Sequence, residues 1–171
     1  MASSIDFRAY DACARPGDED FLFRLYASTR EEEISAWGWN QAQQEAFLRM
    51  QYNAQRRWYD MAYPGAGHRL ILDNAEPIGR ILVHRAAGRI ELVDISLLSE
   101  HRNRGIGTAL LRELIEESRK SRASVRLQVL RNNEGAIRLY RRLGFAIVNE
   151  DEIRYHMEWK IESEARSQES E

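Results

Sequence analysis

The chain has 171 residues, and 43% of them are hydrophobic, which is enough for one well-packed domain but short for two. Lys and Arg number 25 against 27 Asp and Glu, so the formal charge of -2 argues against bulk-charge binding to nucleic acid or a membrane. The single cysteine, Cys13, supports neither an intramolecular disulfide nor a metal framework. Since membrane-span and secretory-signal patterns are also missing, we expect one cytoplasmic domain over 1–171 with a flexible acidic tail at 161–171.

The first third of the chain predicts one strand and two helices. "SIDFRAY" is typical of a strand, and "GDEDFLFRLYAST" predicts a helix because acidic residues open it and apolar residues recur on one face. Residues 40 to about 62 contain no Gly or Pro and predict a long helix that "YPGAG" ends. The apolar residues at helical spacing in that segment are Phe47, Met50, Ala54, Trp58 and Met61.

The middle of the chain changes to strand patterning. Residues 68–73, 77–85 and 89–98 are rich in Ile, Leu and Val, and the separators "NAEP" and "AAG" predict three antiparallel strands. In the third strand the apolar phase slips by one residue near Leu92 and Val93. Either a bulge or burial on both faces explains such a slip.

The last third predicts a mixed sheet. An apolar stripe over 110–115 predicts a helix, "SVRLQVL" predicts a strand, and this order implies a parallel crossover. "NNEGAIRLYRRLGF" predicts a short helix that Asn132 or Asn133 caps and Gly144 ends. "FAIVN" and "EIRYHMEW" predict a final hairpin.

The stretch "RNRGIG" places a charged, glycine-rich turn at the start of the helix that follows the third of these strands. A helix N-terminus presents unpaired N–H groups with partial positive charge, and glycines let the backbone approach a ligand closely. Arginine side chains and the Thr108 hydroxyl add donors, so the turn suits a phosphate group. Its spacing is neither that of the P-loop nor the full dinucleotide fingerprint.

Two motifs resemble the GCN5-related N-acetyltransferases (GNAT). "RNRGIG" matches the family's R-x-x-G-x-G/A signature for acetyl-CoA, and "NEGAIRLYRRLGF" matches its N-x-x-A-x-x-x-Y-x-x-x-G-F element. The resemblance covers residues 68 to 159. It implies the GNAT acyl-CoA N-acyltransferase fold, an α/β (α+β) fold with a mixed sheet of about seven strands and four helices, in which the central fourth strand is bulged and splayed from the fifth.

The resemblance also implies that acetyl-CoA is the co-substrate and that no metal takes part. The pantetheine arm would then meet the third middle strand near its end, the pyrophosphate would sit in the glycine turn, and an asparagine would contact the cofactor. The residues at these positions are Ile95, Leu97 and Leu98 for pantetheine, Arg102, Asn103, Arg104, Gly105, Ile106, Gly107 and Thr108 for pyrophosphate, and Asn133.

Two catalytic roles follow from the same resemblance. Tyr140 matches the tyrosine that protonates the departing thiolate, and a phenol of pKa about 10 can protonate a thiolate whose pKa is about 8 to 9. The attacking amine must be neutral, so a base is expected: Glu91 first, then Asp94 or a water relay. Some branches carry a glutamate where this chain has Gln128, which leaves the base open.

The function predicted is acetyl transfer from acetyl-CoA to a primary amine on a small molecule or a peptide. The sequence does not decide whether acyl groups other than acetyl are transferred. It also leaves the oligomeric state undecided, and a homodimer is one of the options. One alternative is a sensor that binds acetyl-CoA without turnover. Another is a partner-binding protein that uses the aromatic helix as its interface.

Three features bear on the acceptor. The four histidines are not at metal-ligand spacing and are expected to be structural or on the surface. Glu31, Glu32 and Glu33 attract a cation or form a solvated face. Seven aromatic residues either line an acceptor pocket or cover the sheet, namely Trp37, Trp39, Phe47, Tyr52, Trp58, Tyr59 and Tyr63.

Overall fold

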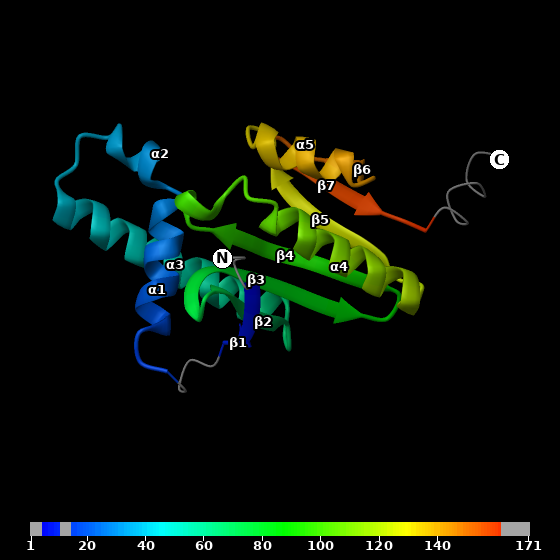
Figure 1. The fold of residues 1–171 in the computed structure, drawn as a ribbon. Helices are drawn as coiled ribbons and strands as arrows, with labels where there is room; N and C mark the ends of the chain where they lie inside the picture. Colours follow the sequence, from blue (N-terminus) through cyan, green and yellow to red (C-terminus); the bar gives the residue numbers. More distant parts are fainter. Residues whose placement is uncertain (1–4, 11–14, 162–171) are drawn as a thin grey trace. The chain divides into compact units, whose positions relative to one another are not determined.

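The computed structural model describes residues 5–10 and 15–161, so Cys13 and almost all of the expected tail lie outside the described residues. Its seven strands follow the order β1-β2-β3-β4-β5-β7-β6 (Figure 1). The chain falls into two compact units, which we call the N-terminal unit (Met1–Leu82 and Asp94–Asn103) and the C-terminal unit (Val83–Val93 and Arg104–Glu171). Strands β3 (Glu76–Ala86) and β4 (Arg89–Leu97) contribute residues to both. Within the described residues, no helix is long and apolar enough to cross a membrane.

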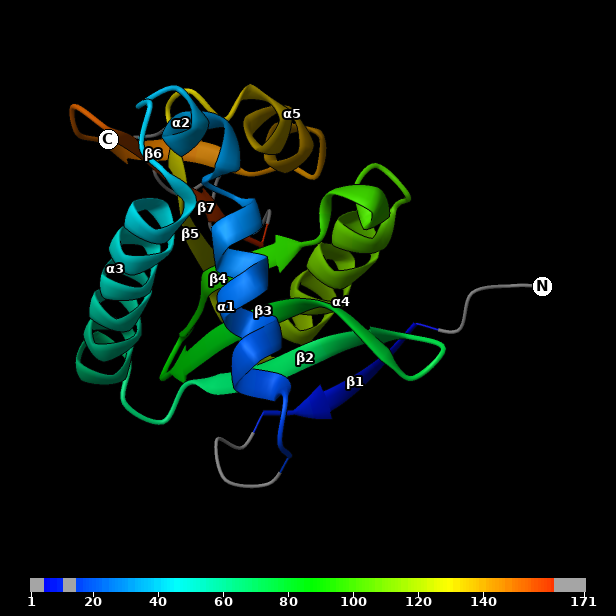
Figure 2. The same ribbon diagram turned by 90° about the vertical axis from the view of Figure 1, so that its left-hand side faces the viewer.

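The N-terminal unit is built on an antiparallel pair. Strand β1 (Ile5–Ala9) pairs with β2 (Gly67–Asp73), with a register from Ile5↔Asp73 to Ala9↔Arg69. Helix α1 (Asp18–Ser28) packs against β2 (Figure 2). Helix α3 (Gln41–Ala62) then leads into β2. The strand and the two helices expected in this third of the chain are therefore confirmed.

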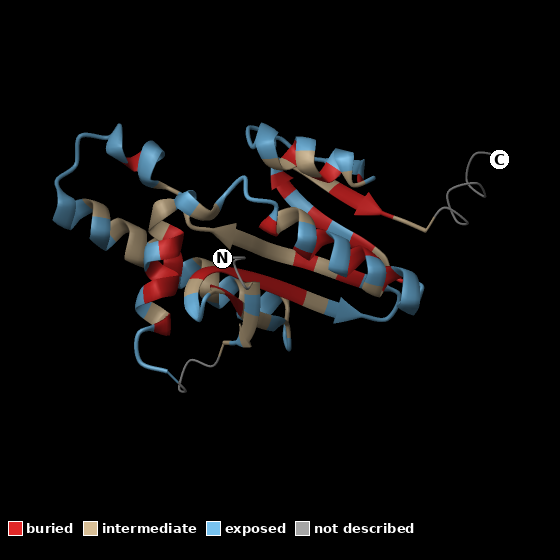
Figure 3. Cartoon of the chain, viewed as in Figure 1, coloured by how far each residue is buried: buried red, intermediate tan, exposed pale blue. Residues whose placement is uncertain are grey.

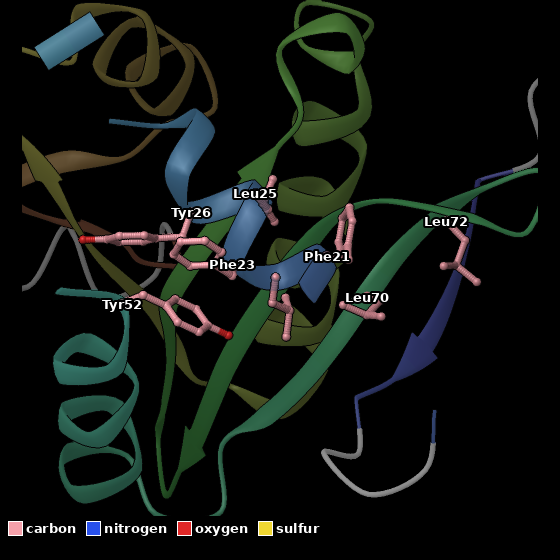
Figure 4. Packing of buried hydrophobic residues seen from close by; sticks show 8 residues of the cluster. Phe21, Phe23, Leu25, Tyr26, Tyr52, Leu70 and Leu72 are labelled. Carbon is pink, nitrogen blue, oxygen red and sulfur yellow. The ribbon is translucent and has the colours of Figure 1, made fainter. Parts of the chain in front are cut away.

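The core of this unit lies between α1, α3 and β2, where apolar side chains of all three elements meet (Figure 4). Tyr52 is the one buried residue of α3, and its ring lies 5.8 Å from that of Phe23 and 5.6 Å from that of Tyr26. Each such side chain contributes about 1.5–3 kcal/mol on burial. The buried cluster consists of Phe21, Leu22, Phe23, Leu25, Tyr26, Tyr52, Leu70 and Leu72.

The apolar residues that indicated α3 lie mostly on its outer side. Asn40 caps the helix in a capping box with Gln43, as its sequence favours. Met50, Trp58 and Met61, however, are 57%, 49% and 75% exposed. The inner side instead carries residues whose polar tips find partners, such as Tyr52 with its hydroxyl on Glu19 at 3.1 Å.

A short helix that the sequence analysis did not predict lies between α1 and α3. Helix α2 (Glu31–Ser35) buries Ile34 and exposes the three glutamates of its first turn. Carboxylates at this position interact favourably with the helix dipole. The acidic run is therefore a solvated helix start, and α2 is a fifth helix beside the four expected.

The C-terminal unit holds the parallel pair. β4 pairs with β5 (Ser124–Leu130) from Arg89↔Ser124 to Leu92↔Leu127, and α4 (Ile106–Ser121) connects the two strands, as expected. Helix α5 (Glu134–Arg142), β6 (Ala146–Glu150) and β7 (Arg154–Trp159) follow. β7 pairs antiparallel with both β5 and β6, so the last strand separates the hairpin's first strand from β5.

Burial in this unit follows the sequence periodicity. Alternate residues of β5 are buried and the inner stripe of α4 is buried, as Figure 3 shows in red along both elements. β6, by contrast, is exposed over its whole length, which suits a strand at the edge of the sheet. The buried residues expected and found are Leu110, Leu111, Leu114 and Ile115 on α4 and Val125, Leu127 and Val129 on β5.

Candidate active site

The glycine turn of the C-terminal unit opens α4 at Gly105, which is exposed. Gly105 is the N-cap residue with a φ of 81°, a left-handed conformation that glycine adopts without strain. The first amide to donate within the helix is that of Ala109, to the Gly105 carbonyl oxygen at 3.0 Å. The amides of Ile106, Gly107 and Thr108 therefore project from the helix end.

This turn fits a phosphate in both shape and charge. The first turn of α4 carries no acidic residue, and no side chain caps it. A Cβ placed on Gly105 would meet nothing within 4 Å, and one on Gly107 would meet only Leu139 Cδ2, at 3.8 Å. The structure brings Arg104, Gly105, Ile106, Gly107 and Thr108 together here, with Arg104 exposed and Thr108 half-buried.

Helix α5 places the second motif in the same unit. Asn133 caps it, its side-chain oxygen accepting a hydrogen bond from the Ala136 amide at 3.2 Å. Tyr140 lies two turns further on and is 7% exposed, with its ring centroid 5.8 Å from that of Phe145. Gly144 ends the helix with a φ of 93°. The glycine and phenylalanine of the motif thus shape the helix end around Tyr140.

Glu91 lies on the paired part of β4. Its side chain is 18% exposed, and its Oε2 is 3.4 Å from Arg89 Nε. Gln128 on β5 is exposed and stands opposite His156 in the β5–β7 register. Of the two carboxylates predicted as the general base, Glu91 is the one that lies in the C-terminal unit.

Asp94 belongs to the N-terminal unit and is already engaged. Its Oδ2 accepts from Arg80 Nε at 2.7 Å, and its Oδ1 accepts from the Ser96 hydroxyl at 3.0 Å. Only 8% of the Arg80 side chain is exposed, so protonating Asp94 would leave a buried cation without its partner. Asp94 is a structural partner of Arg80 and a poor candidate for the base.

The phase slip in β4 coincides with a change in burial. Residues 89 to 92 alternate between outward and buried positions, whereas 93 to 97 are all half-buried. Burial on both faces is therefore wrong as an explanation for the slip. The pairs Arg89↔Ser124 to Leu92↔Leu127 are in unbroken register, so a bulge stays a prediction for the part of β4 after Leu92.

The remaining predicted cofactor residues lie in the N-terminal unit, where backbone contacts hold several of them. The Leu98 amide donates to the Ile78 carbonyl oxygen at 2.9 Å, and Arg102 Nε donates to the Leu97 carbonyl oxygen at 2.9 Å. Asn103 has a φ of 58°, and Ile95 is half-buried. The predicted set thus divides between the two units, and the roles of Ile95, Leu97, Leu98, Arg102 and Asn103 stay predictions.

Three of the histidines behave as surface or structural residues. His101 Nδ1 is 3.9 Å from Asp73 Oδ2, His156 Nε2 is 3.5 Å from Asp151 Oδ2, and His84 is half-buried on β3. Within residues 5–10 and 15–161, no three His, Cys, Asp or Glu side chains are grouped so that they could hold a metal ion. His68 differs from the other three because it faces a pocket.

The seven aromatic residues around α3 separate into two groups. Trp37, Trp39 and Phe47 form a cluster with ring centroids 5.1–5.4 Å apart, in which the two tryptophans are exposed and Phe47 is half-buried. Tyr52, Tyr59 and Tyr63 line a pocket of about 530 Å³, and Trp58 packs on the last two of them from outside. Three of the seven residues thus line a pocket, and that this pocket takes the acceptor stays a prediction.

Sequence reasoning missed most of the other residues of this pocket, among them His68 and Arg80. A signal for Arg80 was present, since it is the one charged residue in the apolar run "PIGRILV". A charge at such a position requires a buried partner. No comparable pattern marks His68.

Comparison with known proteins gives the family. The family model described as "Acetyltransferase (GNAT) family" matches residues 23–145. The chain belongs to this family and is an acetyl-CoA-dependent N-acetyltransferase. No curated protein sequence matches it significantly.

Solved structures share the fold at low sequence identity. The PaiA N-acetyltransferase from Thermoplasma acidophilum, solved with coenzyme A, has a TM-score of 0.69 at 21% identity, covering 92% of this chain and 99% of its own. A GNAT acetyltransferase from Elizabethkingia anophelis, solved with acetyl-CoA, has 0.58 at 16%, covering 92% and 98%. Arabidopsis thaliana Naa50, solved with the bisubstrate analogue CoA-Ac-MVNAL, has 0.59 at 19%, covering 92% and 99%. The expected fold is thereby confirmed.

Proposed function

We propose that this protein transfers the acetyl group of acetyl-CoA directly to a primary amine on a small molecule or a peptide, without an acyl-enzyme intermediate. The observation that carries the proposal is the exposed N-terminus of α4 at Gly105 together with the capped helix α5 that holds Tyr140. An anion site and a buried phenol on adjacent elements of one unit are what transfer from a phosphate-bearing thioester requires.

The turn and the Asn133 cap would hold the co-substrate. The amides of Ile106, Gly107 and Thr108 would donate to its pyrophosphate, and Arg104 would add a charge-assisted hydrogen bond. Acetyl-CoA supplies the acetyl group and a thiolate leaving group when it is bound. The open space around Gly105 and Gly107 supports this fit, because no side chain would have to move.

Tyr140 and Glu91 would handle the protons. The amine nitrogen forms a bond to the acetyl carbon while the carbon–sulfur bond breaks, and the electron pair of that bond goes to sulfur. Tyr140 gives its phenolic proton to the thiolate. Glu91, directly or through a water, takes a proton from the nitrogen, so that charge balances over one turnover. The Glu91 side chain is 18% exposed, which leaves its carboxylate accessible to a water.

The experiment measures thiol release from acetyl-CoA over panels of amines and short peptides. We expect release that depends on the amine and falls at least tenfold in Tyr140→Phe and in Glu91→Gln, while calorimetric affinity for acetyl-CoA stays within about threefold. Gln128→Ala, on an exposed position of β5, is the control and should match the parent protein. Unchanged turnover in Tyr140→Phe would remove that residue as the acid.

A further inference from the structure

A buried ion pair joins β3 to the second half of β4 within the N-terminal unit, and the proposed chemistry assigns it no role. The side chains of Arg80 and Asp94 are only 8% and 16% exposed. Arg80 Nε donates to Asp94 Oδ2 at 2.7 Å, and Arg80 Nη2 pairs with the same oxygen. Arg80 Nη2 also donates to Gln55 Oε1 of α3 at 3.1 Å. One guanidinium group thus ties three elements of this unit together.

Stability alone does not explain a charged pair at this place. Arg80 lies in the apolar run "PIGRILV", where an apolar side chain would avoid the cost of removing a guanidinium group from water. Replacing a buried ion pair by well-packed apolar residues often leaves stability unchanged or raises it. A buried pair can add specificity instead, because its hydrogen bonds are directional and favour one placement of the two strands. The pair therefore fixes where this part of β4 lies.

The anchored part of β4 includes the residues predicted to meet the pantetheine arm of acetyl-CoA. We call residues 94–98 the β4 end segment. Asp94 binds Arg80 through Oδ2 and accepts a hydrogen bond from the Ser96 hydroxyl through Oδ1, at 3.0 Å. At the other end of the segment, the Leu98 amide donates to a carbonyl oxygen of β3 at 2.9 Å. The segment is therefore held at both ends.

The same anchor sets the direction of the side chains in this segment. Successive side chains of a strand point to opposite sides. Asp94 and Ser96 share one side, as their hydrogen bond shows, and it is the side on which Asp94 meets Arg80. Ile95 and Leu97 are thereby turned to the other side, where the resemblance places the pantetheine arm.

Resting on the predicted place of that arm, we infer that Arg80 is a positioning residue for binding of the co-substrate. Through Asp94, it holds the β4 end segment in the conformation that receives the pantetheine arm, and it does not itself contact the reacting atoms. Without the pair, the segment would have to become ordered when CoA binds. Fixing the backbone of a single residue lowers affinity about tenfold.

Calorimetry with two probes tests this inference without turnover. CoA carries the pantetheine arm, whereas 3′-phosphoadenosine 5′-diphosphate carries the same pyrophosphate without the arm. The double variant Arg80→Met with Asp94→Leu replaces the pair by apolar side chains and should keep the fold, which thermal unfolding checks. We expect it to bind CoA about tenfold more weakly than the parent and to bind the second probe within about twofold of the parent.

A milder variant and a second measurement support the same test. Arg80→Lys keeps a cation at this place but cannot reproduce the two donors that Arg80 directs at Asp94, so it should weaken CoA about threefold and leave the second probe unchanged. Amide hydrogen exchange reports the position of the backbone directly. Exchange in the β4 end segment should rise at least about tenfold in the double variant, while exchange in β1 stays the same.

Arg85→Gln with Glu117→Gln is the matched control. Arg85 also lies on β3, and its pair with Glu117 of α4 is exposed on both sides, at 46% and 38%. This control should bind both probes as the parent does. Parent-like affinity for CoA in both Arg80 variants would overturn the inference, and so would an equal loss of the two probes.

Thiol release separates this inference from the proposed function. The double variant should raise the KM for acetyl-CoA about tenfold and keep kcat within about threefold, because neither residue contacts the reacting atoms. If amines are acetylated and this KM is unchanged, the function stands and Arg80 has only a structural role. If CoA affinity falls as expected but the parent acetylates no amine, the positioning role stands and the proposed transfer is wrong.

Discussion

Gly79 and Ser96 approach so closely that a Cβ on Gly79 would stand 2.4 Å from the Ser96 carbonyl oxygen. It would also stand 2.7 Å from Leu97 Cδ2. A backbone oxygen cannot move aside as the end of a flexible side chain can, so the close approach of β3 to the end of β4 depends on glycine at position 79.

Gly79→Ala should therefore lower the free energy of unfolding by about 3 kcal/mol, the upper end of what overpacking costs. Urea denaturation measures this. Gly135→Ala is the control, because a Cβ there meets nothing within 4 Å and the residue lies in α5; it should raise stability by about 0.5 kcal/mol. Equal stabilities of the two variants would contradict the close approach.

The two glycines of the α4 turn should respond differently to alanine. Gly105→Ala must adopt a φ of 81° and should destabilise the protein by about 1–2 kcal/mol. Gly107→Ala adds a Cβ 3.8 Å from Leu139 Cδ2, an ordinary contact, so stability should be kept or slightly raised. Thermal unfolding separates the two.

Gly107 also offers a test of the phosphate turn itself. Gly107→Trp should block access to the helix amides and weaken acetyl-CoA at least tenfold by calorimetry, whereas Gly107→Ala should stay within about threefold. Retained affinity in the tryptophan variant would place the pyrophosphate elsewhere.

Arg8 and Asp18 tie β1 to the start of α1 through two parallel hydrogen bonds, 2.6 and 2.8 Å long. Only 9% of the Asp18 side chain is exposed, so Arg8→Ala would leave a buried carboxylate without its partner. This variant should lower the free energy of unfolding by about 3 kcal/mol. Replacing both, Arg8→Met with Asp18→Leu, should cost less than Arg8→Ala alone. Denaturation midpoints of the three variants test this order, and a double variant less stable than Arg8→Ala would contradict it.

The same pair should contribute to acid sensitivity. The hydrogen bonds from Arg8 hold the pKa of Asp18 below its usual 3.8. The folded state therefore binds this proton less readily than the unfolded chain, and the stabilisation is present above about pH 4 and lost as pH falls below that value.

His68 predicts a second pH dependence in a different window. Its pKa falls from 6.5 in the unfolded chain to about 4 in the folded protein, so the unfolded state binds more protons between these values. The free energy of unfolding should drop by up to about 3 kcal/mol as pH falls from 6.5 to 4, and it should be unaffected by this group above pH 6.5. Chemical denaturation of the parent and of His68→Phe measures the slope, which should be smaller in the variant. Identical slopes would show that His68 is not buried in its neutral form.

Much of the fold was predictable because local sequence and tertiary packing agree. "SVRLQVL" alternates as β5 does, Asn40 and Gly144 mark helix ends by their own chemistry, and the α4 turn is a contiguous run. The glycine turn and the Tyr140 motif were likewise found because each is local in sequence.

The features that the sequence did not predict depend on contacts between residues that lie far apart in the chain. Tyr52 is buried because its hydroxyl reaches Glu19, 33 residues away, and Arg80 is buried because Asp94 pairs with it. The helical periodicity was read from apolar side chains alone. It therefore predicted burial for the side of α3 that carries Met50, Trp58 and Met61, which is the exposed side. His68 and Arg80 were missed as residues of the pocket for the same reason, since its wall joins segments from Tyr10 to Leu82.

The position of β7 between β5 and β6 has a consequence for synthesis. β5 gains its second neighbour only when residues 154–159 have been made, and β6 has no place in the sheet before then. As the chain grows from the ribosome, β5 and β6 therefore remain with unpaired edges, and the C-terminal unit cannot complete its sheet before β7 has been made. A nonsense codon before Arg154 would remove β7 and leave β5 and β6 each with an unpaired strand edge. The shortened product should therefore aggregate and should not persist as a smaller folded protein.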